Sequence, residues 1–135
     1  MSGQRFACQP GCTVCCQRKG FVYLTDDDIA RAARFLGMTV AVFEKRYIYR
    51  TRNLRRLRLP RGGLCRFLRA DGCSIHPVKP TQCRIFPFWP ELDGGREWRR
   101  TADWCPGIGQ GDLVQIETAR ALSHEMRTAY PSMYP

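Results

Sequence analysis

The sequence contains no apolar run that approaches the roughly 18–20 residues needed to span a bilayer, so no membrane segment is expected. Its first residues lack the apolar core and the small-residue cleavage pattern of a secretory signal. Repeats, low-complexity tracts and an internal linker are absent as well. With 135 residues, the chain has room for one modest core. We therefore expect a single domain over residues 1–135, located in the cytoplasm.

Motifs for several kinds of catalysis are also missing. There is no Ser-His-Asp set and no pair of acids at a readable spacing, so nothing supports hydrolytic chemistry. No glycine-rich loop indicates a site for S-adenosylmethionine. The sequence therefore leaves open whether the chain is an enzyme, and which residues would be catalytic.

Cysteine, by contrast, is abundant and unevenly placed. Four of the eight cysteines lie within nine residues, spaced C-x3-C-x2-C-C around a Pro10-Gly11 turn, and four are dispersed. In a reducing compartment such cysteines are metal ligands more often than disulfides, although an even count also suits a disulfide scaffold. Thiolate is the soft ligand that selects zinc, copper(I) and iron–sulfur clusters. We predict that all eight are metal ligands: Cys8, Cys12, Cys15, Cys16, Cys65, Cys73, Cys83 and Cys105.

The spacing of the first cysteines bears on the metal. The C-x3-C-x2-C pattern of Cys8, Cys12 and Cys15 resembles the one that holds three irons of a [4Fe-4S] cluster in radical-SAM enzymes, whose barrel is too long for this chain. Zinc fingers usually show two C-x2-C pairs, and only Cys12 and Cys15 have that spacing here. We favour an iron–sulfur cluster completed by one dispersed cysteine, with zinc as the alternative. Adjacent Cys15 and Cys16 point in different directions, so they are expected to serve different sites.

The charge is strongly positive and locally concentrated. Formal net charge is +10, and residues 45–69 hold ten Lys or Arg with no Asp or Glu. Such a run is most often a solvated face, but it also suits an acidic protein, nucleic acid, or an anionic metal site nearby. Because aromatic and glycine residues do not interleave as in RNA-binding motifs, we expect weak, non-specific nucleic-acid binding at most.

Local patterns predict several elements. Thr25 and Asp28 form a capping box for a helix that ends at Gly37, and Thr39 caps a second helix. Asp71-Gly72 indicates a hairpin between residues 63–68 and 73–76. Further expected elements are an extended segment at 20–24, a strand beginning at Leu57, a helical turn at 81–87, a strand at 98–104, a turn at 107–111, and a helix at 113–128 capped by Asp112. We predict a small α+β fold with two N-terminal helices, a short antiparallel hairpin region and a C-terminal helix, knitted together by cysteine-bound metal.

The ordered set of motifs resembles a known family. The motifs are Cys8 with Cys12-x2-Cys15-Cys16, Thr25-x2-Asp28, Cys65-Arg-Phe, Cys73-Ser-Ile-His76, Lys79-Pro80-x2-Cys83-Arg84 and Cys105-Pro-Gly107. Together they are similar to the CxxCxxCC (YkgJ-type) cysteine-cluster family. The resemblance implies chelation of zinc or iron by these cysteines. Some longer relatives are assigned as lysine N-methylases acting on flagellin, which suggests protein modification.

Two further residues lie beside cysteines. Arg84 follows Cys83 and is interpreted as a cofactor-binding residue that donates to cluster sulfides or holds a carboxylate, with a surface salt bridge as the alternative. His76 is interpreted as a packing or hydrogen-bonding residue. The sequence thus predicts an iron–sulfur protein with a redox or protein-modification role. The alternative is a zinc-binding structural module whose basic face binds an acidic partner or nucleic acid.

Overall fold

The computed structural model describes residues 4–9, 12–17, 21–58, 65–70 and 72–135. These residues form five α-helices and three separate pairs of antiparallel strands, which confirms the mixed α+β class. No described helix is long and apolar enough to cross a membrane. The predicted Pro10-Gly11 turn lies outside the described residues.

The two N-terminal helices form as the sequence predicts. Helix α1 (Asp26–Phe35) begins with the Thr25–Asp28 capping box and is followed by Gly37 at a φ of 69°. Helix α2 (Val40–Tyr47) begins after Thr39, whose hydroxyl accepts a hydrogen bond from the Val42 amide at 3.2 Å. Both starts were predictable because a capping interaction involves residues only three positions apart.

The basic run contains a β-hairpin that the sequence did not predict. Strands β2 (Ile48–Arg50) and β3 (Arg55–Leu57) pair antiparallel, with Ile48 opposite Leu57. Leu57 ends a strand, so the expected strand beginning there is wrong; Leu59 lies outside the described residues. The described part of the expected extended segment, residues 21–24, lies along β3, where the Leu24 amide donates to the Arg55 carbonyl at 2.9 Å.

The cysteine-containing hairpin is present but short. Strands β4 (Leu68–Arg69) and β5 (Gly72–Cys73) pair with Leu68 opposite Cys73, and Asp71 between them lies outside the described residues. Cys65 precedes β4 instead of lying on it, although its carbonyl accepts from the Leu68 amide at 3.1 Å. The 3-10 turn η2 (His76–Val78) and helix α3 (Thr81–Ile85) follow, which confirms the predicted helical turn.

The expected strand at residues 98–104 is wrong. Residues Gly95–Ala102 form helix α4, preceded by the 3-10 turn η3 (Pro90–Leu92). Trp98 and Thr101 are buried while Arg99 and Arg100 between them are exposed, which is helical and not alternating spacing. Arginines between the two buried positions concealed the helical periodicity.

The predicted turn at 107–111 is present, inside a strand that the sequence did not predict. Strand β6 (Ile108–Val114) pairs antiparallel with β1 (Gln4–Phe6) at the other end of the chain, and the pairing jumps from Leu113 opposite Arg5 to Ile108 opposite Phe6. The Gln110 amide donates to the Gly107 carbonyl at 3.2 Å, as in a β-turn, and Gly109 and Gly111 have positive φ.

The last helix begins later than expected. Helix α5 covers Ile116–Ala129 after Gln115, and Asp112 lies in β6 and does not cap the helix. Of the expected inner face, Ala119 and Met126 are buried, Ile116 and Leu122 are half-buried, and Leu113 in β6 is exposed. The sequence located the helix but misplaced its start, because Leu113 and Val114 pair with β1 instead of joining the helix.

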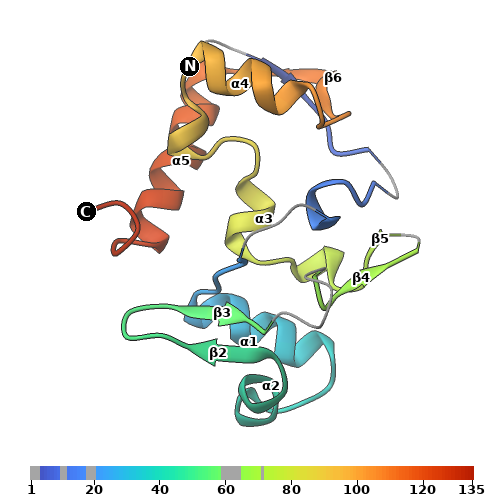
Figure 1. Ribbon diagram of the computed structural model, residues 1–135, viewed down its shortest axis with the longest axis vertical. Coiled ribbons are helices and arrows are strands. Elements are labelled where there is room, and N and C mark those ends of the chain that lie inside the picture. Colours follow the sequence, from blue (N-terminus) through green and yellow to red (C-terminus); the bar gives the residue numbers. More distant parts are fainter. Residues whose placement is uncertain (1–3, 10–11, 18–20, 59–64, 71) are drawn as a thin grey trace.

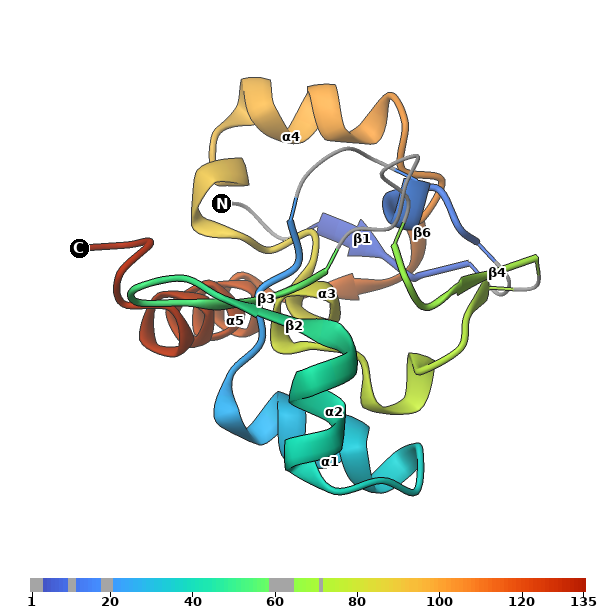
Figure 2. The same cartoon turned by 60° about the horizontal axis from the view of Figure 1, so that its bottom comes forward.

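Two buried clusters support the arrangement in Figure 1. One joins α1, α2 and the β2–β3 hairpin, at the bottom of the view, and centres on Ile29, Phe43 and Leu57. The other joins α3, α4 and α5 and includes Ile85 and Met126. Helix α3 lies between the two ends of the molecule in Figures 1 and 2, so its residues can contact both.

Candidate metal centre

One cavity gathers cysteines from distant parts of the chain. It has a volume of about 470 Å³ and is lined by six cysteines: Cys8, Cys12, Cys15, Cys65, Cys73 and Cys83. The 3-10 turn η1 (Cys15–Gln17), drawn in blue, lies beside the β4–β5 hairpin in both views. The structure therefore places most of the predicted ligands around a common space.

Different elements carry these six thiols. Cys8 follows β1, while Cys12 and Cys15 belong to the segment that ends in η1. Cys65 precedes β4, Cys73 lies on β5, and Cys83 lies on α3. A ligand held by these residues would connect the N-terminus, the hairpin and the central helix.

Burial affects the protonation of these thiols. Burial raises the pKa of Cys8, and the ammonium of Lys79 is the largest influence that opposes it. Burial also raises the pKa of Cys65 and of Cys73, against hydrogen bonds from nearby backbone amides. The pKa of Cys83 is raised furthest, first by burial and then by negative charge on Cys65, Cys15 or Cys73. A metal ion would therefore have to displace protons to bind here.

The seventh described cysteine lies nearby. Cys105 is 8% exposed and lines a small adjoining cavity of about 20 Å³ together with Cys8, Cys12 and Cys15. The segment after Cys105 is held against the N-terminal segment, since the Ala7 amide donates to the Gly107 carbonyl at 3.0 Å. Cys16 lies in η1, and its side chain is outside the described part of the structure.

The donor set fits a thiophilic metal. Six cysteines carry free thiols in the structure: Cys8, Cys12, Cys65, Cys73, Cys83 and Cys105. In the described part of the chain, no group of three Cys, His, Asp or Glu side chains holds a coordinating geometry as it stands. Soft thiols around one cavity nevertheless match zinc or iron–sulfur chemistry, so binding would draw them closer together.

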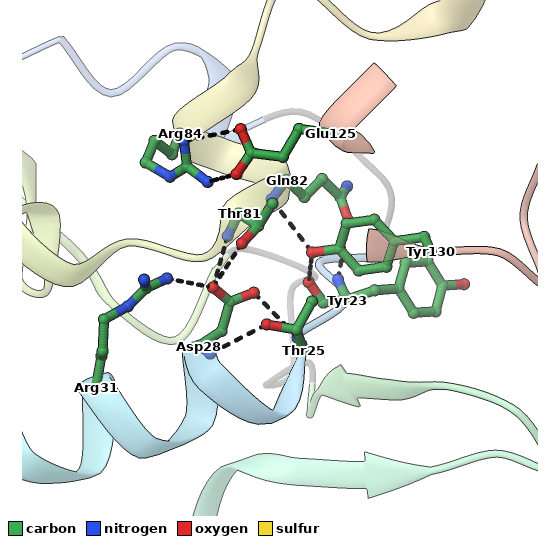
Figure 3. A network of polar contacts seen from close by, with 9 residues as sticks. All are labelled: Tyr23, Thr25, Asp28, Arg31, Thr81, Gln82, Arg84, Glu125 and Tyr130. Atoms are coloured by element: carbon green, nitrogen blue, oxygen red, sulfur yellow. Dashed lines mark hydrogen bonds and ion pairs between the residues drawn. The ribbon is translucent and has the colours of Figure 1, made fainter. Parts of the chain in front are cut away.

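A buried polar network positions α3 beside this cavity (Figure 3). The carboxylate of Asp28, 1% exposed, accepts hydrogen bonds from the Thr81 amide and hydroxyl at 3.0 and 2.8 Å. It also accepts from the Thr25 amide at 3.0 Å and from Arg31 at 2.7 Å. One carboxylate thus caps α1 and receives the first amide of α3, which fixes the helix that carries Cys83.

The same network reaches the C-terminal helix. The Gln82 side chain accepts from the Tyr23 amide at 2.9 Å and donates to the Phe21 carbonyl at 3.1 Å. The Tyr130 hydroxyl donates to the Tyr23 carbonyl at 2.7 Å and accepts from the Gln82 amide at 3.2 Å. The segment after the N-terminal cysteines is therefore held against α3 and the end of α5.

Arg84 lies at the cavity wall but is already paired. Its guanidinium forms a two-atom ion pair with the Glu125 carboxylate on α5, and both side chains are about half exposed. The hydrogen bond that Arg84 donates to the Glu125 carboxylate raises the pKa of Arg84. The structure therefore shows the salt bridge that the sequence offered as the alternative.

Several residues of the basic run also have partners within the chain. Arg50 pairs with Glu44 at 2.6 Å, and Arg55 pairs with Asp26 and with Glu44. The guanidinium of Arg56 lies 3.9 Å from the ring centre of Phe21 and 4.6 Å from that of Tyr49. These contacts reduce the number of cations that an external polyanion could reach.

Sequence reasoning missed the residues that support the site. It assigned no role to Thr81, Gln82 or Tyr130, and it treated Asp28 as a helix cap only. Lys79, which lines the cavity, was noted only within a motif. One signal in the sequence could have pointed to these supporting residues. Polar Thr81 and Gln82 directly precede Cys83, and the fold buries both of them.

Comparison with known protein families gives a match to a cysteine-rich domain family. The family model CxxCxxCC, described as a putative zinc- or iron-chelating domain, matches residues 7–106. All eight cysteines, from Cys8 to Cys105, fall within this range. No solved structure matches the chain.

Proposed function

The chain belongs to the CxxCxxCC family, and from that premise we propose that it binds metal through its cysteines, as an iron–sulfur protein with a redox or protein-modification role. The observation that carries the proposal is the convergence of six cysteines from the N-terminal segment, the hairpin and α3 on one cavity. A hydrophobic core gains nothing specific from so many thiols, whereas a thiophilic metal needs several of them.

The cysteines divide into two neighbouring sets. Cys8, Cys12 and Cys15 line both cavities. Cys105 lines only the smaller cavity, while Cys65, Cys73 and Cys83 line only the larger one. If the metal centre is a [4Fe-4S] cluster, Cys105 is the dispersed cysteine best placed to bind it together with Cys8, Cys12 and Cys15. Cys16, next in the chain, would be available to the second set.

Aromatic residues line part of the site, while Cys8 and Cys15 are exposed to solvent. Phe86 and Trp104 stack with ring centres 5.5 Å apart, and both line the two cavities. A bound iron–sulfur cluster would supply one-electron transfer, and its potential would depend on exclusion of water and on nearby charge. Arg84 would contribute positive charge at the wall of the site, and direct donation to the cofactor would require it to leave Glu125.

Zinc is the second candidate. Four thiolates in a closed set are also the usual ligands of structural zinc, and seven cysteines around two adjoining cavities suffice for such a set. In that case the chain would be a structural module, and its exposed basic residues would bind an acidic protein or, weakly, nucleic acid.

Thiol counting tests metal binding through these cysteines. The metal-loaded native chain is expected to show at most two reactive thiols, because at least six of the eight are ligands. Adding a strong chelator should expose the others and lower the melting temperature, since binding energy here is also folding energy. Four or more reactive thiols in folded, metal-loaded protein would reject the proposal.

A further inference from the structure

We propose that Lys79 is a positioning residue of the metal centre, whose ammonium group stabilises the negative charge of the metal-bound thiolates. This inference rests on the proposed function and deepens it, because it assigns a role at the site to a residue that is not itself a ligand.

Lys79 lies at the cavity that gathers the cysteines. Its side chain lines the cavity together with the six cysteines, and no Asp or Glu is among the described residues of that lining. Its Nζ contacts the Nε2 atom of exposed His76 at 3.4 Å. No described carboxylate pairs with Lys79, whereas the other long cationic side chain of the lining, Arg84, is paired with Glu125.

The Lys79 side chain shares the cavity lining with cysteines from three separate segments: Cys8 after β1, Cys73 on β5 and Cys83 on α3. An ammonium group in such a lining attracts any thiolate formed there, and the attraction is stronger where water is excluded. One side chain can thus act on three segments that a metal would join.

The backbone holds Lys79 in place on both sides. The turn η2 precedes it, and Pro80 restricts it to an extended conformation, seen as a ψ of 149°. The next amide, that of Thr81, donates to buried Asp28. The base of the side chain is therefore fixed between η2 and α3, which lowers the conformational cost of aiming the ammonium at the cavity.

A metal site bound by thiolates would be negatively charged, and a nearby ammonium group would stabilise it. Four thiolates around Zn²⁺, or around a [4Fe-4S]²⁺ core, leave a net charge of about −2 in a cavity with apolar walls. An ammonium group is a compact point charge with three rotatable donors, so it can approach sulfur from several directions.

The experiment measures zinc affinity by competition with a chromophoric chelator under reducing conditions. Lys79→Gln is expected to weaken zinc binding about 10-fold or more, within the usual range for residues that support metal ligands. Lys79→Arg should retain most of the affinity, and Lys79→Glu should lose more than Lys79→Gln. Lys45→Gln on α2, an exposed lysine away from the cavity, serves as the matched control and should change nothing.

A purely structural role would give another pattern. Because Lys79 is only half-buried, the metal-free melting temperature of Lys79→Gln should equal that of wild type. Equal zinc affinity of wild type and Lys79→Gln would overturn this inference while leaving the proposed function intact. The same holds if Lys79→Arg and Lys79→Glu weaken binding equally. If wild type binds neither zinc nor iron, the proposed function fails and this inference fails with it.

Discussion

The carboxylate of Asp28 on α1 accepts two hydrogen bonds from Thr81 at the start of α3, 53 positions along the chain. Since α1 belongs to one buried cluster and α3 contributes Ile85 to the other, this pair joins the two halves of the molecule. Buried charged groups are stable only when their hydrogen bonds are satisfied, and Asp28 has four donors.

Asp28→Asn is expected to destabilise the chain by about 3 kcal/mol, because a neutral amide replaces a charged acceptor and its NH₂ group faces donors. Thermal unfolding followed by circular dichroism would measure the loss. The matched control is Asp27→Asn at the exposed neighbouring position, where only a helix-dipole interaction of about 1 kcal/mol or less is at stake. Equal effects of the two variants would contradict the structural role of Asp28.

Gly111→Ala is expected to destabilise more than Gly109→Ala. Both positions have positive φ, which costs an L-residue about 1–2 kcal/mol. At Gly111 a Cβ would also lie 2.5 Å from the Cβ of Ala7, whereas at Gly109 nothing lies within 4 Å. The overlap should add about 1–3 kcal/mol, measured by denaturant unfolding. Similar losses for both variants would show that β6 does not approach the N-terminal segment this closely.

The basic run is expected to bind nucleic acid only weakly. Arg50 and Arg55 pair with acidic residues, and Arg56 stacks on two aromatic rings, so three of these cations are already engaged within the chain. Fluorescence anisotropy should give a dissociation constant about micromolar or weaker that rises steeply with salt. Replacing exposed Arg52 and Arg58 with Gln should weaken nucleic-acid binding further. Arg50→Gln should reduce the affinity less, because Arg50 is paired with Glu44. Nanomolar, sequence-selective binding at physiological salt would contradict this expectation.

What the sequence predicted of the fold was local. The starts of α1 and α2 follow from capping residues three positions from their partners, and the hairpin follows from the residues of its turn. The pairing of β1 with β6 joins Arg5 to Leu113, and no local pattern encodes a contact over that separation. The same pairing explains the error near it, the start predicted too early for α5.

The candidate site was predictable in composition and not in arrangement. The cysteines could be predicted as ligands from their density in the sequence and from the motifs around them. Their division between two cavities, with Cys105 beside Cys8 and Cys12, depends on how residues 105–107 pack against Ala7. The supporting residues were harder to predict, because a lysine or a glutamine gains a role only from the groups that the fold places around it.

The measurement that tests the central claim most directly is metal analysis with a visible absorption spectrum, on chain purified without oxygen. Iron–sulfur centres absorb broadly in the visible, and zinc thiolates are colourless, so the two metals are distinguished at once. We predict a coloured protein containing iron and sulfide, which Cys12→Ser bleaches while also lowering the melting temperature. A colourless preparation with about two equivalents of zinc, and no iron after attempted reconstitution, would contradict the iron–sulfur assignment.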